Sequence, residues 1–65
     1  MTYVLATTGN IMRWYHIKID KDGKLIGFDL LERLDQRKVT MFGNRATAKY
    51  AALAVELKTW KYVKL

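Results

Sequence analysis

The sequence contains no cysteine, no proline and no serine, and it has a single histidine, His16. The missing cysteines exclude disulfide bonds and fit a reducing compartment. One histidine without cysteine cannot complete a zinc site, which needs several such ligands. A serine nucleophile is also excluded, and a threonine nucleophile would depend on His16 alone. We therefore expect a binding protein rather than an enzyme, with no catalytic residue, metal or cofactor.

Long apolar runs are absent as well. No stretch approaches the ~20 apolar residues of a membrane span, and the N-terminus lacks the basic start and apolar run of a signal peptide. A cytoplasmic protein that does not bind membranes is therefore expected. Hydrophobic residues make up 51% of the chain, which argues against disorder. Its 65 residues suffice for one compact domain, residues 1–65, and leave no room for a second core.

Acidic residues are scarce in the second part of the chain. Residues 1–37 hold six bases and five acids, whereas residues 38–65 hold six bases and one acid, Glu56. The bases of this second segment are Lys38, Arg45, Lys49, Lys58, Lys61 and Lys64. Five of the six net positive charges thus fall in one segment. Such a concentrated field suggests a polyanionic partner, of which nucleic acid is the commonest.

Glycine beside Asn or Asp divides the first half of the chain. Gly9-Asn10 separates two β-like runs, and Asp20-Lys21-Asp22-Gly23 predicts a hairpin loop in which Gly23 supplies a positive φ. The residues after this loop do not provide the ligands of a calcium-binding loop. Residues 29–37 remain ambiguous between a continued strand and a helical turn, because a short apolar run fits both periods. The strands predicted here are residues 2–7, 11–19 and 24–31.

The second half predicts a helix between two strands. The pattern of residues 38–42 predicts a strand that ends at Gly43, and Asn44 suits the helix N-cap. The helix should run from Arg45 to about Lys58, and residues 59–65 should form the last strand. Its expected apolar face consists of Ala46, Tyr50, Leu53, Ala54 and Leu57. Its expected solvent-facing stripe consists of Arg45, Lys49, Ala52 and Glu56.

The predicted element order is therefore β-β-β-β-α-β. It indicates an α+β fold in which an antiparallel sheet of four to five strands packs one face on the helix. The run from Thr40 to Asn44, followed by an alanine-rich helix, resembles the strand–turn–helix of AP2-like and integrase arm-binding domains. This resemblance covers about a third of the chain and implies a sheet that reads duplex DNA. The predicted strand after the helix departs from that plan.

Alternation along the strands groups the aromatic and basic residues. Residues i and i+2 of a strand share a face, so Trp14, His16 and Lys18 lie together, as do Trp60, Tyr62 and Lys64. If Ile17 and Val63 pack under the helix, both groups lie on the opposite face. Aromatic rings stack on bases for about 1–3 kcal/mol each, and lysines neutralise phosphates, so such a face would suit nucleic acid.

The expected start of the helix adds two further bases. Arg45 and Lys49 are one turn apart at an end where the helix dipole favours acids, an arrangement that suits a bound phosphate. We therefore predict a nucleic-acid-binding protein, with DNA preferred over RNA. The candidate contact residues are Arg13, Trp14, His16, Lys18, Arg45, Lys49, Lys58, Trp60, Tyr62 and Lys64.

Two other interpretations of the same residues stay open. Trp and Tyr are common core residues in a small sheet, and lysines often protect strand edges from aggregation. Alternatively, the aromatic face or a free strand edge could bind an acidic protein surface or a second copy. By analogy with small proteins of phages and mobile elements, the chain would then act as an inhibitor or adaptor.

Overall fold

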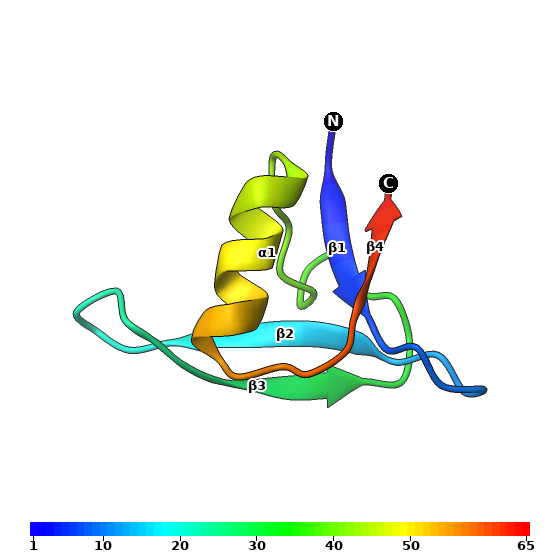
Figure 1. The fold of residues 1–65 in the computed structure, drawn as a ribbon, viewed down its shortest axis with the longest axis horizontal. Helices are drawn as coiled ribbons and strands as arrows, with labels where there is room; N and C mark the ends of the chain where they lie inside the picture. Colours follow the sequence, from blue (N-terminus) through cyan, green and yellow to red (C-terminus); the bar gives the residue numbers. More distant parts are fainter.

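Four strands and one helix make up the fold in our computed structural model, which describes residues 1–65 (Figure 1). The strands form one four-stranded sheet in the order β3-β2-β1-β4. This arrangement confirms the predicted α+β class with an antiparallel sheet and a single helix. The elements are β1 (Tyr3–Ala6), β2 (Trp14–Ile19), β3 (Leu25–Leu31), α1 (Arg45–Ala54) and β4 (Lys61–Lys64).

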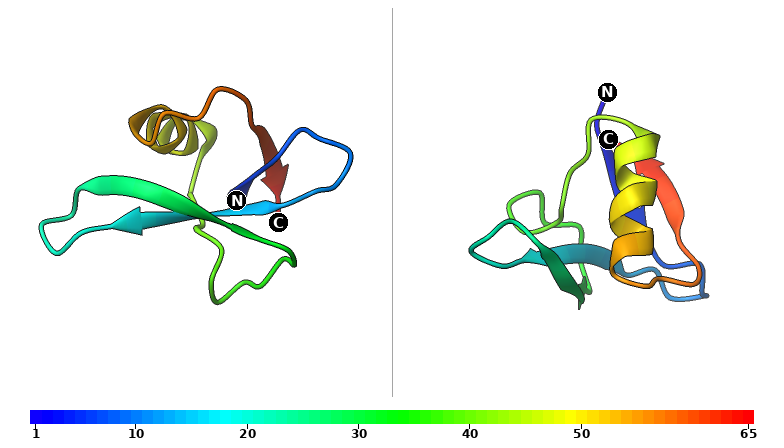
Figure 2. Two further views of the ribbon diagram at one scale, coloured as in Figure 1. Left: turned by 90° about the horizontal axis from the view of Figure 1, so that it is seen from below. Right: turned by 60° about the vertical axis from the view of Figure 1, so that its left-hand side comes forward.

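The sheet is sharply bent where β1 meets β2. These two strands share only the pair Ala6 and Trp14, whereas β2 pairs with β3, and β1 with β4, over most of their lengths. The result is two ribbons set at a wide angle, with α1 lying in the angle between them (Figures 1 and 2). Beyond this pair Thr40 occupies the edge of β2. Its hydroxyl accepts from the Ile17 amide at 2.7 Å, and its own amide donates to the Tyr15 carbonyl at 3.3 Å.

The β2–β3 hairpin loop has the predicted conformation. The Asp20 carboxylate accepts hydrogen bonds from the amides of Asp22 at 2.9 Å and Lys24 at 2.8 Å. Gly23 has a φ of 84°, in the left-handed region where a Cβ is unfavourable. A register shift between Lys18 and the following residue places a bulge beside this loop. Local side-chain hydrogen bonds thus set the turn, as the sequence indicated.

The segment between β3 and α1 differs from the prediction. The strand continues to Leu31, and a turn follows in which the Asp35 carbonyl accepts from the amides of Lys38 and Val39. The ambiguous residues 29–37 are therefore strand and then turn. Of the predicted strand 38–42, only Phe42 pairs, in a single bridge with Tyr3. A full strand does not form: the Thr40 amide donates to Tyr15, but the Ile17 amide donates to the Thr40 hydroxyl and not to a backbone carbonyl.

The helix begins as predicted and ends four residues earlier. The Asn44 side chain caps it by accepting from the Thr47 amide at 2.8 Å. At its other end the amides of Glu56 and Leu57 donate to the carbonyls of Leu53 and Ala52, at 3.1 and 2.9 Å. These two bonds, with Glu56 at a φ of 63°, form a Schellman motif that terminates α1 at Ala54.

The predicted apolar face of the helix is wrong. The helix buries its alanines, Ala48, Ala51 and Ala52, while Tyr50 is 70% and Leu53 56% exposed. Ala46 and Ala54 are also exposed, whereas Leu57, in the turn after the helix, is buried as expected. Small side chains let the helix approach the sheet closely, so larger residues from the strands and the Phe42 segment fill the core. The core cluster consists of Leu5, Tyr15, Ile17, Phe42, Ala48, Ala51, Ala52 and Leu57.

Candidate nucleic-acid interface

Trp60 and Tyr62 lie on the helix side of the sheet, not on the outer face. Tyr62 is directly opposite Leu5, which is fully buried in the core, and both aromatic residues pack against the core cluster. Val63 pairs instead with Val4 on the other side of the ribbon. The predicted single face that joins Trp60 and Tyr62 to Trp14 and His16 is therefore wrong. The aromatic rings fill the space that an alanine-faced helix leaves beside the sheet.

Arg45 is held between two tyrosine rings. Its guanidinium carbon is 5.6 Å from the ring centre of Tyr3 and 5.7 Å from that of Tyr62, both within cation–π range. Tyr3 was not among the predicted site residues. Its position in β1 is the signal that points to it. Tyr3 is two residues before Leu5, and it therefore lies on the same side of the strand as that core residue. The two rings orient a charged group that a free arginine side chain would leave mobile.

Two lysines lie near this arginine. Lys64 pairs with Tyr3 across β1 and β4 and shares a face with Tyr62, and Lys49 is one turn along the helix from Arg45. We call Arg45, Lys49, Lys64, Tyr3 and Tyr62 the basic end. The start of the helix, the start of β1 and the end of β4 lie together in Figure 1, at the top of the view.

No acidic side chain compensates the basic end. The first turn of α1 has no acid, and the two ion pairs of the structure lie elsewhere. They join Lys18 to Asp29 at 3.4 Å and Arg37 to Asp35 at 3.7 Å. The first intrahelical bond runs from Ala48 to Asn44, which leaves the two leading amides of the helix free for an anion.

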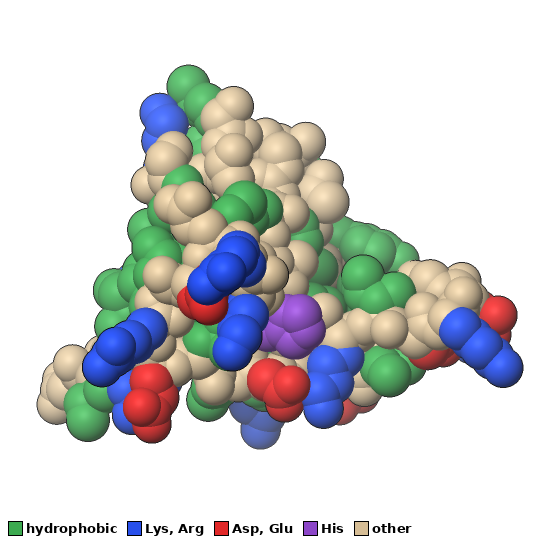
Figure 3. Space-filling view, turned by 180° about the vertical axis from the view of Figure 1, so that it is seen from behind, with side chains coloured by type: hydrophobic (Ala, Val, Ile, Leu, Met, Phe, Trp, Pro, Cys, Tyr) green, Lys and Arg blue, Asp and Glu red, His purple; other side chains and the backbone are tan.

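The outer face of β2 holds the other predicted strand residues. Trp14 and His16 are half-buried there, opposite Leu31 and Asp29 of β3. His16 Nδ1 hydrogen bonds the Lys38 carbonyl. In Figure 3 the histidine lies among basic and acidic side chains of this face. Because its charges are mixed and Asp29 already pairs with a lysine, this face attracts an anion less than the basic end does.

The ten predicted residues thus occupy several places. The basic end contains four of them, Arg45, Lys49, Tyr62 and Lys64. The strand β2 contains Trp14, His16 and Lys18, and Arg13 directly precedes it. Lys58 is exposed in the connection between α1 and β4, and Trp60, two residues later, packs on the core.

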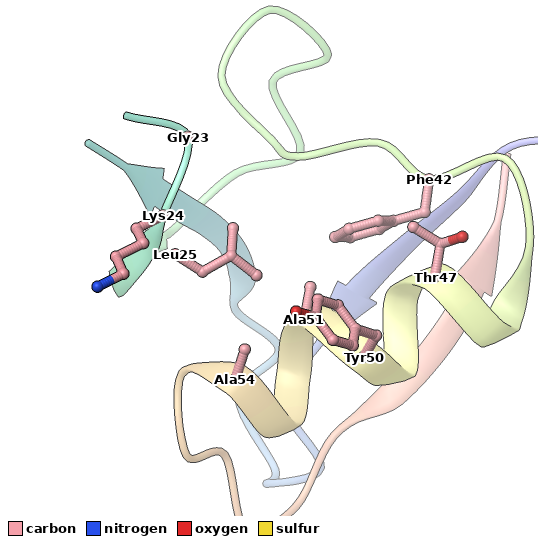
Figure 4. Close-up of a pocket in the computed structure, with 8 residues that line it drawn as sticks. All are labelled: Gly23, Lys24, Leu25, Phe42, Thr47, Tyr50, Ala51 and Ala54. Carbon is pink, nitrogen blue, oxygen red and sulfur yellow. The ribbon is translucent and has the colours of Figure 1, made fainter. Parts of the chain in front are cut away.

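A groove that the sequence did not predict lies between α1 and the β2–β3 hairpin. Its volume is about 510 Å³, and Leu25 and Phe42 point into it from opposite sides (Figure 4). Tyr50, Ala51 and Ala54 line it from the helix. The sequence assigned Tyr50 and Ala54 to the packed face of the helix, so it predicted a filled interface at this position.

The structure shows no group of three His, Cys, Asp or Glu residues that could hold a metal ion. It also contains no helix with the length and apolar character needed to cross a membrane. No protein-family model matches this chain, and neither the curated proteins nor the solved structures that we searched contain a match.

Proposed function

We propose that this protein binds nucleic acid without catalysis, with DNA as the preferred partner and the basic end as the main contact. The observation that carries this proposal is the position of Arg45, oriented by two tyrosine rings and close to lysines that have no acidic partner. Only this part of the molecule combines an oriented guanidinium, free helix amides and uncompensated charge.

The chemistry of these groups suits phosphate oxygens. A guanidinium presents parallel N–H donors that bind a phosphate at two points, and an ammonium neutralises charge without fixed geometry. Arg45 would position the phosphate, and Lys49 and Lys64 would neutralise its neighbours. In this proposal Arg13, Lys18 and Lys58 contact the nucleic-acid backbone farther from the basic end. Trp14, His16, Trp60 and Tyr62 offer ring surface to bases or support the basic side chains.

Fluorescence anisotropy of a labelled DNA duplex over a salt series tests the proposal. Each phosphate contact should contribute about −0.9 to the slope of log affinity against log salt. Arg45→Gln should weaken binding and make the slope less steep. The matched control is Lys21→Gln, which removes one positive charge from the exposed β2–β3 loop. If duplex DNA and single-stranded RNA both fail to bind at ~50 mM salt, the proposal is wrong, because electrostatic contacts are strongest there.

A protein-binding inhibitor or adaptor is the second candidate. The exposed Tyr50 and Leu53 of α1 and the neighbouring groove favour it, because large apolar groups left in water often mark an interface. The salt dependence of binding distinguishes the two functions. Apolar contacts with an acidic protein should survive a rise in salt that removes DNA from the basic end.

A further inference from the structure

The outer edge of the sheet at β3 is weakly protected, because its one charged residue, Asp29, is paired with Lys18 of β2 and its one irregularity is the bulge at Ile26. Its sequence, Leu-Ile-Gly-Phe-Asp-Leu-Leu, contains no lysine, arginine or proline, the residues that commonly keep edge strands from pairing. The opposite edge, β4, is shorter and carries Lys61 and Lys64. No hydrogen bond from outside the β2–β3 ribbon reaches the backbone of β3. The β3 edge of the sheet is therefore open to pairing with another strand.

Apolar side chains accompany this open edge. Phe28 and Leu30 are opposite Ile17 and Tyr15, which places them on the helix side of the sheet, and both are exposed. Ile26, at the bulge, is 62% exposed. The groove of Figure 4 begins next to them, at Leu25. The edge and its neighbours thus form an apolar strip beside free backbone donors and acceptors.

The surface of the isolated chain is large for its mass. It exposes 4786 Å², whereas a folded monomer of 7.6 kDa typically exposes about 4,300 Å². The backbone forms 30 internal hydrogen bonds, against about 45 in a typical domain of this length. The excess of roughly 500 Å² approaches the ~800 Å² that each partner buries in a standard interface. A second copy could therefore cover the area that one chain leaves open.

We propose that two copies of this chain pair through β3, antiparallel and about a two-fold axis, to make one continuous sheet. A register centred on Phe28 uses all seven residues of the strand. It places Ile26 opposite Leu30 and Gly27 opposite Asp29 of the second copy. A register centred on Asp29 would set two carboxylates against each other, which is unfavourable. The proposal does not depend on nucleic-acid binding and is tested in its absence.

Sedimentation equilibrium tests the pairing between about 10 µM and about 1 mM protein. Salt at ~0.3 M screens the repulsion between two chains of net charge +6. The mean mass should rise from 7.6 kDa towards twice that value. Ile26→Lys should raise the dissociation constant at least about tenfold, because it puts two charges at the open edge. Phe28 is less suitable for this substitution, since its ring lies 5.2 Å from that of the buried Tyr15.

Ile11→Lys is the matched control. Ile11 is 66% exposed in the connection before β2, so this variant adds the same charge away from the edge and should associate like the parent chain. Amide hydrogen exchange should slow in residues 25–31 as the concentration rises. A chain that stays at 7.6 kDa at about 1 mM would overturn the proposal, even if the edge binds a strand of another protein. So would a dimer that both lysine variants weaken equally.

Discussion

Glu56 is the one residue other than glycine with a positive φ, 63°, and it occupies the position of the Schellman motif where glycine is usual. A Cβ in this conformation costs about 1–2 kcal/mol. The motif nevertheless forms, since its two backbone bonds turn the chain so that Leu57 enters the core. The burial of Leu57 offsets the local strain at Glu56.

Glu56→Gly should therefore stabilise the protein. Removing the Cβ relieves the strain, while glycine gives the unfolded chain more freedom, so we expect a net gain of about 0.5–1 kcal/mol in the free energy of unfolding. Urea denaturation followed by tryptophan fluorescence measures it. Glu56→Gln is the control, because it removes the same carboxylate but keeps the Cβ. Equal gains in both variants would assign the effect to charge.

Tyr3 is expected to act through Arg45. Tyr3→Leu removes one of the two rings beside the guanidinium and should weaken DNA binding about two- to fivefold, as the loss of an exposed cation–π contact predicts. Tyr3→Phe keeps the ring and should bind DNA like the parent protein. Anisotropy titration compares the two. If the phenylalanine variant is as weak as the leucine variant, the hydroxyl and not the ring orients Arg45.

At the scale of elements, the sequence reports which residues share a face but not which face is buried. Alternation correctly groups Trp60 with Tyr62 and Tyr15 with Ile17. The choice of the helix-facing side of β4 is wrong, because Val63 and Tyr62 both bury apolar area and only the pairing with β1 decides between them. Caps and turns at Asn44, Asp20 and Gly23 are local and were predictable. Tyr62 was predicted as a contact residue, but its contact with Arg45, and that of Tyr3, depend on how β1, β4 and α1 pack together and were not predictable.

The helix provides the clearest test of which face is buried. Ala52 is fully buried and Leu53 largely exposed, the reverse of the sequence pattern. Ala52→Leu should cost about 1–3 kcal/mol through overpacking against the sheet, whereas Leu53→Ala should change stability by less than ~0.5 kcal/mol. Thermal and urea unfolding of both variants measure these costs. A larger loss for Leu53→Ala would mean that the helix packs through its other face.

For the whole molecule, stability depends on a small core and an unbalanced charge. Only 11 of the 65 residues are buried, and Leu5 and Val4 are the largest fully buried side chains. There is no disulfide to constrain the unfolded chain. The chain has a net charge of +6 and forms only two ion pairs. Repulsion between its positive charges is therefore stronger in the compact folded state than in the extended unfolded chain.

The melting temperature should therefore rise with salt between about 0.01 and 0.3 M, because screening weakens this repulsion. Circular dichroism at fixed protein concentration follows the transition. A Lys58→Gln, Lys61→Gln double variant should melt higher than the parent at low salt and converge with it at high salt. A melting temperature that falls with salt would show instead that attractive charge pairs dominate.

The β1–β4 ribbon also determines how the molecule would respond to a pulling force. Tyr3 and Lys64 are paired neighbours, so both ends of the chain leave the ribbon on the same side (Figure 1). In an antiparallel pair the hydrogen bonds lie perpendicular to the strands. Tension applied to the two ends would load these bonds one after another, as in a zipper, and not all at once. The fold is thus mechanically weak along the line joining its ends, whatever its thermodynamic stability.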